Sequence, residues 1–108
     1  MKEYNVLLCC GAGMSSGFLA QQLRSAAKKK KIPMQAAAKS QNDIEEYLSA
    51  ADVLLIGPHL AYLKEDLEKK CEPYHIPVEI IPKDVYAALN GAKLLEQVLA
   101  LLEGKGDI

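Results

Sequence analysis

The chain has almost no net charge: 13 lysines and arginines stand against 14 aspartates and glutamates, which leaves a formal charge of -1 at pH 7. Nucleic-acid binders and membrane-surface proteins usually carry a clear excess of positive charge. No apolar run approaches the length of a membrane span, and the apolar stretch in the N-terminal MKEYNVLLCC is too short for a signal peptide. The sequence therefore predicts a cytoplasmic protein that binds no nucleic acid and inserts nothing into the membrane.

Cysteine is scarce and unevenly placed. The chain has three, Cys9, Cys10 and Cys71, and two of them are adjacent. An odd number that includes a neighbouring pair is not typical of a secreted disulfide scaffold, so it also favours a reducing cytoplasm. The cysteines and the two histidines lack the spacing of metal ligands. We expect no metal site and no other cofactor.

The pattern of apolar residues indicates one domain. A chain of 108 residues can bury its own core, and no repeat, linker or low-complexity segment divides residues 1–108. Short apolar runs bounded by glycine or proline mark strands. The predicted strands are 4–9, 34–40, 52–57 and 78–82. The signal for 34–40 is weak because alanine is a poor strand former, and only its place between two helices favours it.

Helices are predicted where apolar residues recur at helical spacing. The first begins at Ser16 and is closed by Pro33, with lysines at 28–31 near its end, where positive charge complements the helix dipole. The others are predicted over 42–51, 60–71 and 84–104. Inside the last, Gly91 costs roughly 1 kcal/mol relative to alanine, which a close contact or a bend would explain.

Strands that alternate with helices at this spacing predict an α/β fold. The expected architecture is an open four-stranded parallel sheet, flanked by helices on both faces and joined by right-handed crossovers. Ligands of such sheets bind beyond the carboxyl ends of the strands, where the strand order reverses. The loop after the first strand, residues 11–17, is therefore the predicted site.

This loop lies in the stretch LLCCGAGMSSGFL, where a cysteine precedes small residues and a helix N-terminus. Backbone N–H groups and the helix dipole at such a corner favour an anion and lower the pKa of a cysteine thiol. Successive strand side chains point in opposite directions, so Cys9 and Cys10 cannot both face the loop. We expect Cys10 at the loop mouth and Cys9 as a small buried hydrophobic residue.

The glycines and serines of the loop suit a phosphate. Gly11 and Gly13 let the backbone approach the oxygens, and Ser15 and Ser16 can donate hydrogen bonds or cap the helix. From spacing alone, a plain strand-turn-helix corner punctuated by glycine explains these residues nearly as well. The residue types therefore leave both interpretations open.

Three stretches together resemble a known family: the loop segment above, LLIGPHLAYL at 54–63 and VEIIPKDVYAALNG at 78–91. They are similar to the enzyme IIB components of the lactose and chitobiose/cellobiose class of the phosphoenolpyruvate-dependent sugar phosphotransferase system. The resemblance runs nearly end to end and implies one IIB type-3 domain over 1–108. It also implies a four-stranded parallel sheet with a phosphatase-like phosphate loop after the first strand.

The resemblance further implies a phosphocysteine mechanism. Cys10 is the implied nucleophile, which takes a phosphoryl group from a phosphohistidine of the IIA partner and passes it to a sugar in the membrane partner IIC. The sugar would be a β-linked disaccharide such as cellobiose, chitobiose or lactose. Gly57, Pro58 and Tyr62 match the family's Gly-Pro-x-x-x-Tyr element. The implied phosphate-binding residues are Gly11, Ala12, Gly13, Met14, Ser15, Ser16 and Gly17.

Two other functions are weighed against this one. Low-molecular-weight tyrosine phosphatases place an arginine six residues after the nucleophilic cysteine on a similar fold. Ser16 occupies that position here, so the guanidinium clamp is missing and hydrolysis is disfavoured. The third interpretation is a non-catalytic anion-binding module, which would carry no covalent phosphate.

Other residues near the predicted site have a functional and a structural interpretation. His59 follows a strand expected beside the first and is predicted as an auxiliary phosphate contact, or else as an ordinary loop histidine. Met14 and Phe18 could form an apolar docking patch or pack in the core. The lysines at 28–31 could steer a partner or simply be solvated. Cys71 is predicted to pack at a helix end.

Overall fold

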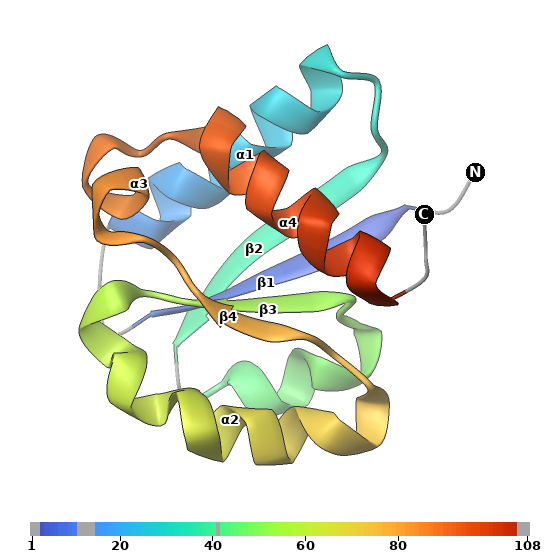
Figure 1. Ribbon diagram of the computed structural model, residues 1–108, viewed down its shortest axis with the longest axis vertical. Helices are drawn as coiled ribbons and strands as arrows, with labels where there is room; N and C mark the ends of the chain where they lie inside the picture. The colour runs from blue at the N-terminus through green and yellow to red at the C-terminus, as the bar shows by residue number, and fades with distance from the viewer. Residues whose placement is uncertain (1–2, 11–14, 41, 106–108) are drawn as a thin grey trace.

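The computed structural model of the protein describes residues 3–10, 15–40 and 42–105. Within these residues, four parallel strands form one sheet in the order β2-β1-β3-β4 (Figure 1). Helices cover both faces of this sheet, which confirms the predicted architecture. The strands are β1 (Tyr4–Cys10), β2 (Met34–Ser40), β3 (Val53–Ile56) and β4 (Val78–Ile80).

The central strands bury side chains on both faces, as their continuous apolar sequences predict. In β1, Val6 and Leu8 belong to one core cluster, while Leu7 and Cys9 belong to the other. The residues of β3 alternate in the same way, and all four are buried. The sheet therefore separates two apolar cores.

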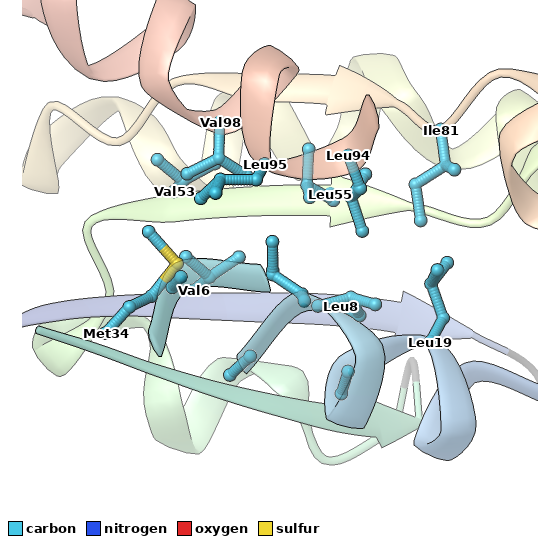
Figure 2. Packing of buried hydrophobic residues seen from close by; sticks show 14 of the residues in the cluster. Val6, Leu8, Leu19, Met34, Val53, Leu55, Ile81, Leu94, Leu95 and Val98 are labelled. Atoms are coloured by element: carbon cyan, nitrogen blue, oxygen red, sulfur yellow. The ribbon is translucent and has the colours of Figure 1, made fainter. Parts of the chain in front are cut away.

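Helices α1 (Ser15–Lys29) and α4 (Gly91–Lys105) cover one face. Figure 2 shows Leu19 of α1 and Leu95 of α4 among the side chains that pack with Leu8 in this layer. The other face is covered by the 3-10 helix η1 (Ile44–Ala50) and by α2 (Lys64–Cys71). On this arrangement each strand leads into a helix that packs back on the sheet, as parallel connections require.

Strand β2 forms despite its alanines. All seven of its residues are in register with β1, from Met34 opposite Tyr4 to Ser40 opposite Cys10. Met34 and Ala36 are buried in the core cluster that includes α1. Tertiary pairing and burial thus outweigh the low strand propensity of alanine, and the weakest strand prediction is confirmed.

Two predicted helices are partly wrong in type. The segment predicted over 42–51 is the 3-10 helix η1, a tighter form that is common in short connections. The segment predicted over 60–71 is divided into the 3-10 helix η2 (Pro58–Leu63) and α2. Pro58 starts η2 after Gly57, which follows β3, and Leu60 has non-helical dihedral angles, so no single α-helix spans this region.

The helix predicted over 84–104 is also wrong, because two helices, α3 (Lys83–Ala88) and α4, replace it. Leu89 adopts a left-handed conformation with φ of 51° and ends α3. Asn90 then caps α4, since its Oδ1 accepts a 3.1 Å hydrogen bond from the Lys93 N–H. A Cβ on Gly91 would collide with the main chain of Gln22 in α1. The prediction of a close contact or a bend at Gly91 is confirmed on both counts.

Candidate functional site

The candidate site lies where the strand order reverses. From β1 the chain crosses to β2 on one side, then returns to β3 on the other, so β1 and β3 flank the switch point. The backbone N–H of Gly57, directly after β3, donates a 2.9 Å hydrogen bond to the carbonyl oxygen of Cys9. This hydrogen bond holds the carboxyl ends of β1 and β3 side by side. Its acceptor, Cys9, directly precedes Cys10.

Cys10 is the last residue of β1, and helix α1 starts five positions later at Ser15. The predicted loop residues Gly11, Ala12, Gly13 and Met14 lie outside the described residues, as do the side chains of Cys10, Ser15 and Ser16. Ser15, Ser16 and Gly17 form the first turn of α1 rather than a loop before it. The first N–H groups of a helix have no intrahelical acceptor, so this turn can still present donors to an anion.

The other two cysteines are buried away from solvent. Cys9 and Cys71 have no exposed surface, belong to the same core cluster and form no disulfide bond. Burial, with a smaller contribution from Cys9, raises the pKa of Cys71 to about 11. Both predictions, Cys9 as a buried hydrophobic residue and Cys71 as a packing residue, are confirmed. Cys9 and Cys71 lie in the same core cluster although they are far apart in the sequence.

His59 lies at the carboxyl end of β3, the strand beside β1, where the sequence predicts it. His59 is exposed. A Cβ on Gly57 would stand 2.8 Å from Cε1 and 3.3 Å from Nδ1 of the His59 ring, and 3.6 Å from the carbonyl oxygen of Cys9. The imidazole therefore occupies the space that a side chain at Gly57 would fill.

Tyr86, to which the sequence reasoning gave no role, lies against His59. Its ring meets the His59 ring edge-on, with centroids 5.6 Å apart and planes at 65°, a favourable aromatic geometry. Tyr86 belongs to α3, which exists as a separate helix because of the break at Leu89. The sequence does show an aromatic residue soon after the last strand, which could have indicated a contact near the strand ends. Because one continuous helix was predicted over 84–104, Tyr86 was not distinguished from its other residues.

Two exposed aromatic residues follow the same strand ends. Phe18 in the first turn of α1 is 59% exposed, and Tyr62 in η2 is 73% exposed. Phe18 is thus a surface residue and not a core residue, whereas its predicted companion Met14 lies outside the described residues. Lys28 and Lys29 end α1, and the lysines at 30 and 31 follow it, about 22 Å along the 15-residue helix from its first turn. That these lysines steer a partner toward the site stays a prediction.

Among residues 3–10, 15–40 and 42–105, no group of three or more His, Cys, Asp or Glu side chains is arranged to hold a metal ion. No helix in those same ranges has both the length and the apolar character of a membrane span.

Comparison with known proteins identifies the family. Residues 5–97 match the family model described as PTS system, lactose/cellobiose-specific IIB subunit. The oligo-beta-mannoside-specific EIIB component of Bacillus subtilis (strain 168) is 34% identical over 97 residues, which are 90% of this chain and 94% of that protein. A lactose-specific EIICB component of Lactococcus lactis subsp. lactis is 34% identical over 71 residues, which are 66% of this chain and 12% of that protein.

Solved structures agree with this result. The solution structure of a cellobiose-specific phosphotransferase IIB component from Borrelia burgdorferi has a TM-score of 0.78 and 35% identity, covering 96% of this chain and 95% of that one. A lactose-specific IIB domain from Streptococcus pneumoniae has the same fold, with a TM-score of 0.85 and 20% identity over 93% of this chain and 98% of that one. Family model, sequence relatives and fold concur: this chain belongs to the lactose/cellobiose-specific IIB subunit family of the sugar phosphotransferase system.

Proposed function

We propose that this IIB protein is a cytoplasmic phosphocarrier with Cys10 as its nucleophile. The observation that carries the proposal is the contrast among its three cysteines. Cys9 and Cys71 are completely buried, whereas Cys10 ends β1 at the switch point of the sheet. A nucleophile must be reachable by two partner molecules in turn, which only the end of the strand allows.

Phosphoryl transfer then proceeds in two steps, first from IIA to Cys10 and then from Cys10 to the sugar. The Cys10 thiolate attacks the phosphorus of a phosphohistidine on IIA, so an S–P bond forms while the N–P bond breaks and its electron pair returns to the imidazole. A sugar hydroxyl next attacks the phosphocysteine, loses its proton and forms an O–P bond as the thiolate leaves. Such transfers depend on positioning and on stabilising charge on the phosphoryl oxygens.

Residues 11–17 are the proposed source of that stabilisation. Backbone N–H groups of Gly11, Ala12, Gly13 and Met14, with the first turn of α1, would surround the phosphoryl oxygens. Helix α1 has 15 residues, so its dipole places positive potential at this end, which favours a phosphate and a thiolate. No side-chain cation is needed for this role, in keeping with Ser16 at the position where phosphatases carry arginine.

The proposed partners are IIA as donor and the membrane permease IIC as the component that binds the acceptor sugar. Support for IIC comes from relatives named EIICB components, of which this chain matches a minor part. Phe18 and Tyr62, exposed after the two central strands, offer apolar area for docking such partners. Relatives are named for oligo-beta-mannoside, galactose, cellobiose and lactose. Together with the family resemblance, these names favour a β-linked disaccharide such as cellobiose, chitobiose or lactose as the proposed substrate.

The test is reconstitution. The protein is incubated with phosphoenolpyruvate, the general phosphocarriers and IIA, and its intact mass should increase by one phosphoryl group. Addition of IIC-containing vesicles and a β-linked disaccharide should then remove that group and produce the sugar phosphate. An unmodified mass, under conditions that phosphorylate a known IIB protein, would refute the carrier role. Steady hydrolysis of an aryl phosphate would instead support a phosphatase.

A further inference from the structure

We propose that Tyr86 is a positioning residue that holds the His59 imidazole at the end of β1, where its ring N–H donates a hydrogen bond to the phosphoryl group on Cys10. This inference rests on the proposed carrier function and adds two side chains to it. It comes from three contacts of the described residues: His59 with Gly57, Gly57 with Cys9, and His59 with Tyr86.

The His59 ring lies beside the carboxyl end of β1. Gly57 is tied to the end of β1 through its 2.9 Å hydrogen bond to the Cys9 carbonyl. The Cε1–Nδ1 edge of the imidazole lies against Gly57, in the space left by the missing side chain. The ring is therefore next to the backbone that leads directly into Cys10, although His59 comes 49 positions later in the sequence.

A contact with Tyr86 keeps the His59 ring in this position. His59 is exposed, and an exposed side chain normally samples several rotamers. The Tyr86 ring, on α3, limits the rotamers of His59 through the edge-on contact between the two rings. The backbone of Tyr86 is itself held in place, because its N–H donates a 3.0 Å hydrogen bond to the Pro82 carbonyl oxygen. Next to Pro82, the Ile81 N–H donates a 2.8 Å hydrogen bond to the carbonyl oxygen of Ile56 in β3.

The imidazole can donate a hydrogen bond to a phosphoryl group. A phosphoryl group bears several strong acceptor oxygens, and an imidazole always carries at least one N–H donor. Hydrogen bonds to charged acceptors are about twice as strong as neutral ones. A donor already held beside the nucleophile loses little conformational entropy when the phosphate arrives. His59 would thus stabilise the transferring phosphoryl group, and Tyr86 would contribute by holding the His59 ring in place.

The experiment is a double-mutant cycle on the rate of phosphoryl transfer from IIA to the full chain, with His59→Ala, Tyr86→Leu and the double variant. His59→Ala should slow transfer about tenfold, the value of one charged hydrogen bond. Tyr86→Leu should slow it several-fold, and its effect should be clearly smaller once His59 is alanine. Tyr86→Phe, which keeps the ring, should transfer faster than Tyr86→Leu. Tyr74→Leu, at an exposed tyrosine after α2, is the matched control.

A second readout separates this inference from the carrier function. The His59 ring protons should show an NMR shift from the Tyr86 ring, and Tyr86→Leu or Gly57→Ala should abolish or change that shift without phosphorylation. The inference is overturned if His59→Ala transfers at the wild-type rate, if Tyr86→Leu slows both backgrounds equally, or if Tyr86→Phe is as slow as Tyr86→Leu. A wild-type chain that accepts no phosphate refutes the carrier function, and with it the role of His59, while the NMR shift still reports the ring contact.

Discussion

Gly91 of α4 lies against the main chain of Gln22 in α1, with no room for a side chain between them. A Cβ at position 91 would meet the Gln22 carbonyl group and would stand 2.8 Å from its Cβ. Backbone atoms cannot move aside as the end of a long side chain can. The contact between these residues therefore sets how closely the two helices pack over the sheet.

Gly91→Ala is accordingly expected to destabilise the protein by roughly 1–3 kcal/mol, the usual cost of overpacking, even though alanine is the better helix former. Urea unfolding measures this change. Ala92→Gly is the control at the next, exposed position, where the loss of helix propensity should cost about 1 kcal/mol. A Gly91→Ala variant as stable as wild type would contradict the close packing described here.

The buried thiol of Cys71 predicts a dependence of stability on alkaline pH. Its pKa is raised from 9.0 to about 11 in the folded protein, chiefly by burial, so the unfolded chain releases the proton first. The free energy of unfolding should therefore fall as the pH rises from 9 towards 11. Urea titrations at pH 8 and pH 10.5 measure the fall, and Cys71→Ala should reduce it. An equal fall in both proteins would exclude Cys71 as a cause.

Arg24 of α1 protects the outer edge of the sheet. Its guanidinium Nη1 donates a 2.6 Å hydrogen bond to the carbonyl oxygen of Ala36 in β2, which is an edge strand. Unpaired carbonyls on such strands invite pairing with another chain. Arg24→Ala should cost about 1 kcal/mol in unfolding free energy and should increase light scattering on heating. Lys29→Ala, an exposed change at the end of the same helix, should do neither.

Phe18 and Tyr62 provide a test of the proposed docking surface. Replacing either with serine should raise the KM for phosphorylated IIA about tenfold, as the loss of an aromatic interface residue does, because the exposed ring can no longer contact the partner. Stability should change little, since both side chains are mostly exposed. Tyr74→Ser is the matched control. An unchanged KM in both variants would place the IIA interface elsewhere on the protein.

The sequence was sufficient to predict the sheet. The apolar runs that became β1 and β3 are buried on both faces, and their place at the centre of the sheet follows from that burial. The division of the last helix was not predicted, because apolar residues recur at helical spacing on both sides of Asn90 and Gly91. Only the left-handed Leu89, the Asn90 cap and the approach of Gln22 to Gly91 separate α3 from α4.

The site could be predicted in part for the same reason. Cys10 was assigned from local chemistry and family resemblance, both of which are properties of a short segment. The contact between His59 and Tyr86 joins residues 27 positions apart, and it depends on a helix break that local periodicity hides. Whether Phe18 was buried or exposed also depended on how α1 lies on the sheet, which its own sequence leaves open.

The central claim is that Cys10 alone carries the phosphoryl group. The most direct measurement is the intact mass of the wild type, Cys9→Ser and Cys10→Ser after incubation with phosphoenolpyruvate, the general phosphocarriers and IIA. We expect one added phosphoryl group on the wild type and on Cys9→Ser, and none on Cys10→Ser. A phosphoryl group that survives Cys10→Ser but disappears in Cys9→Ser would contradict the assignment.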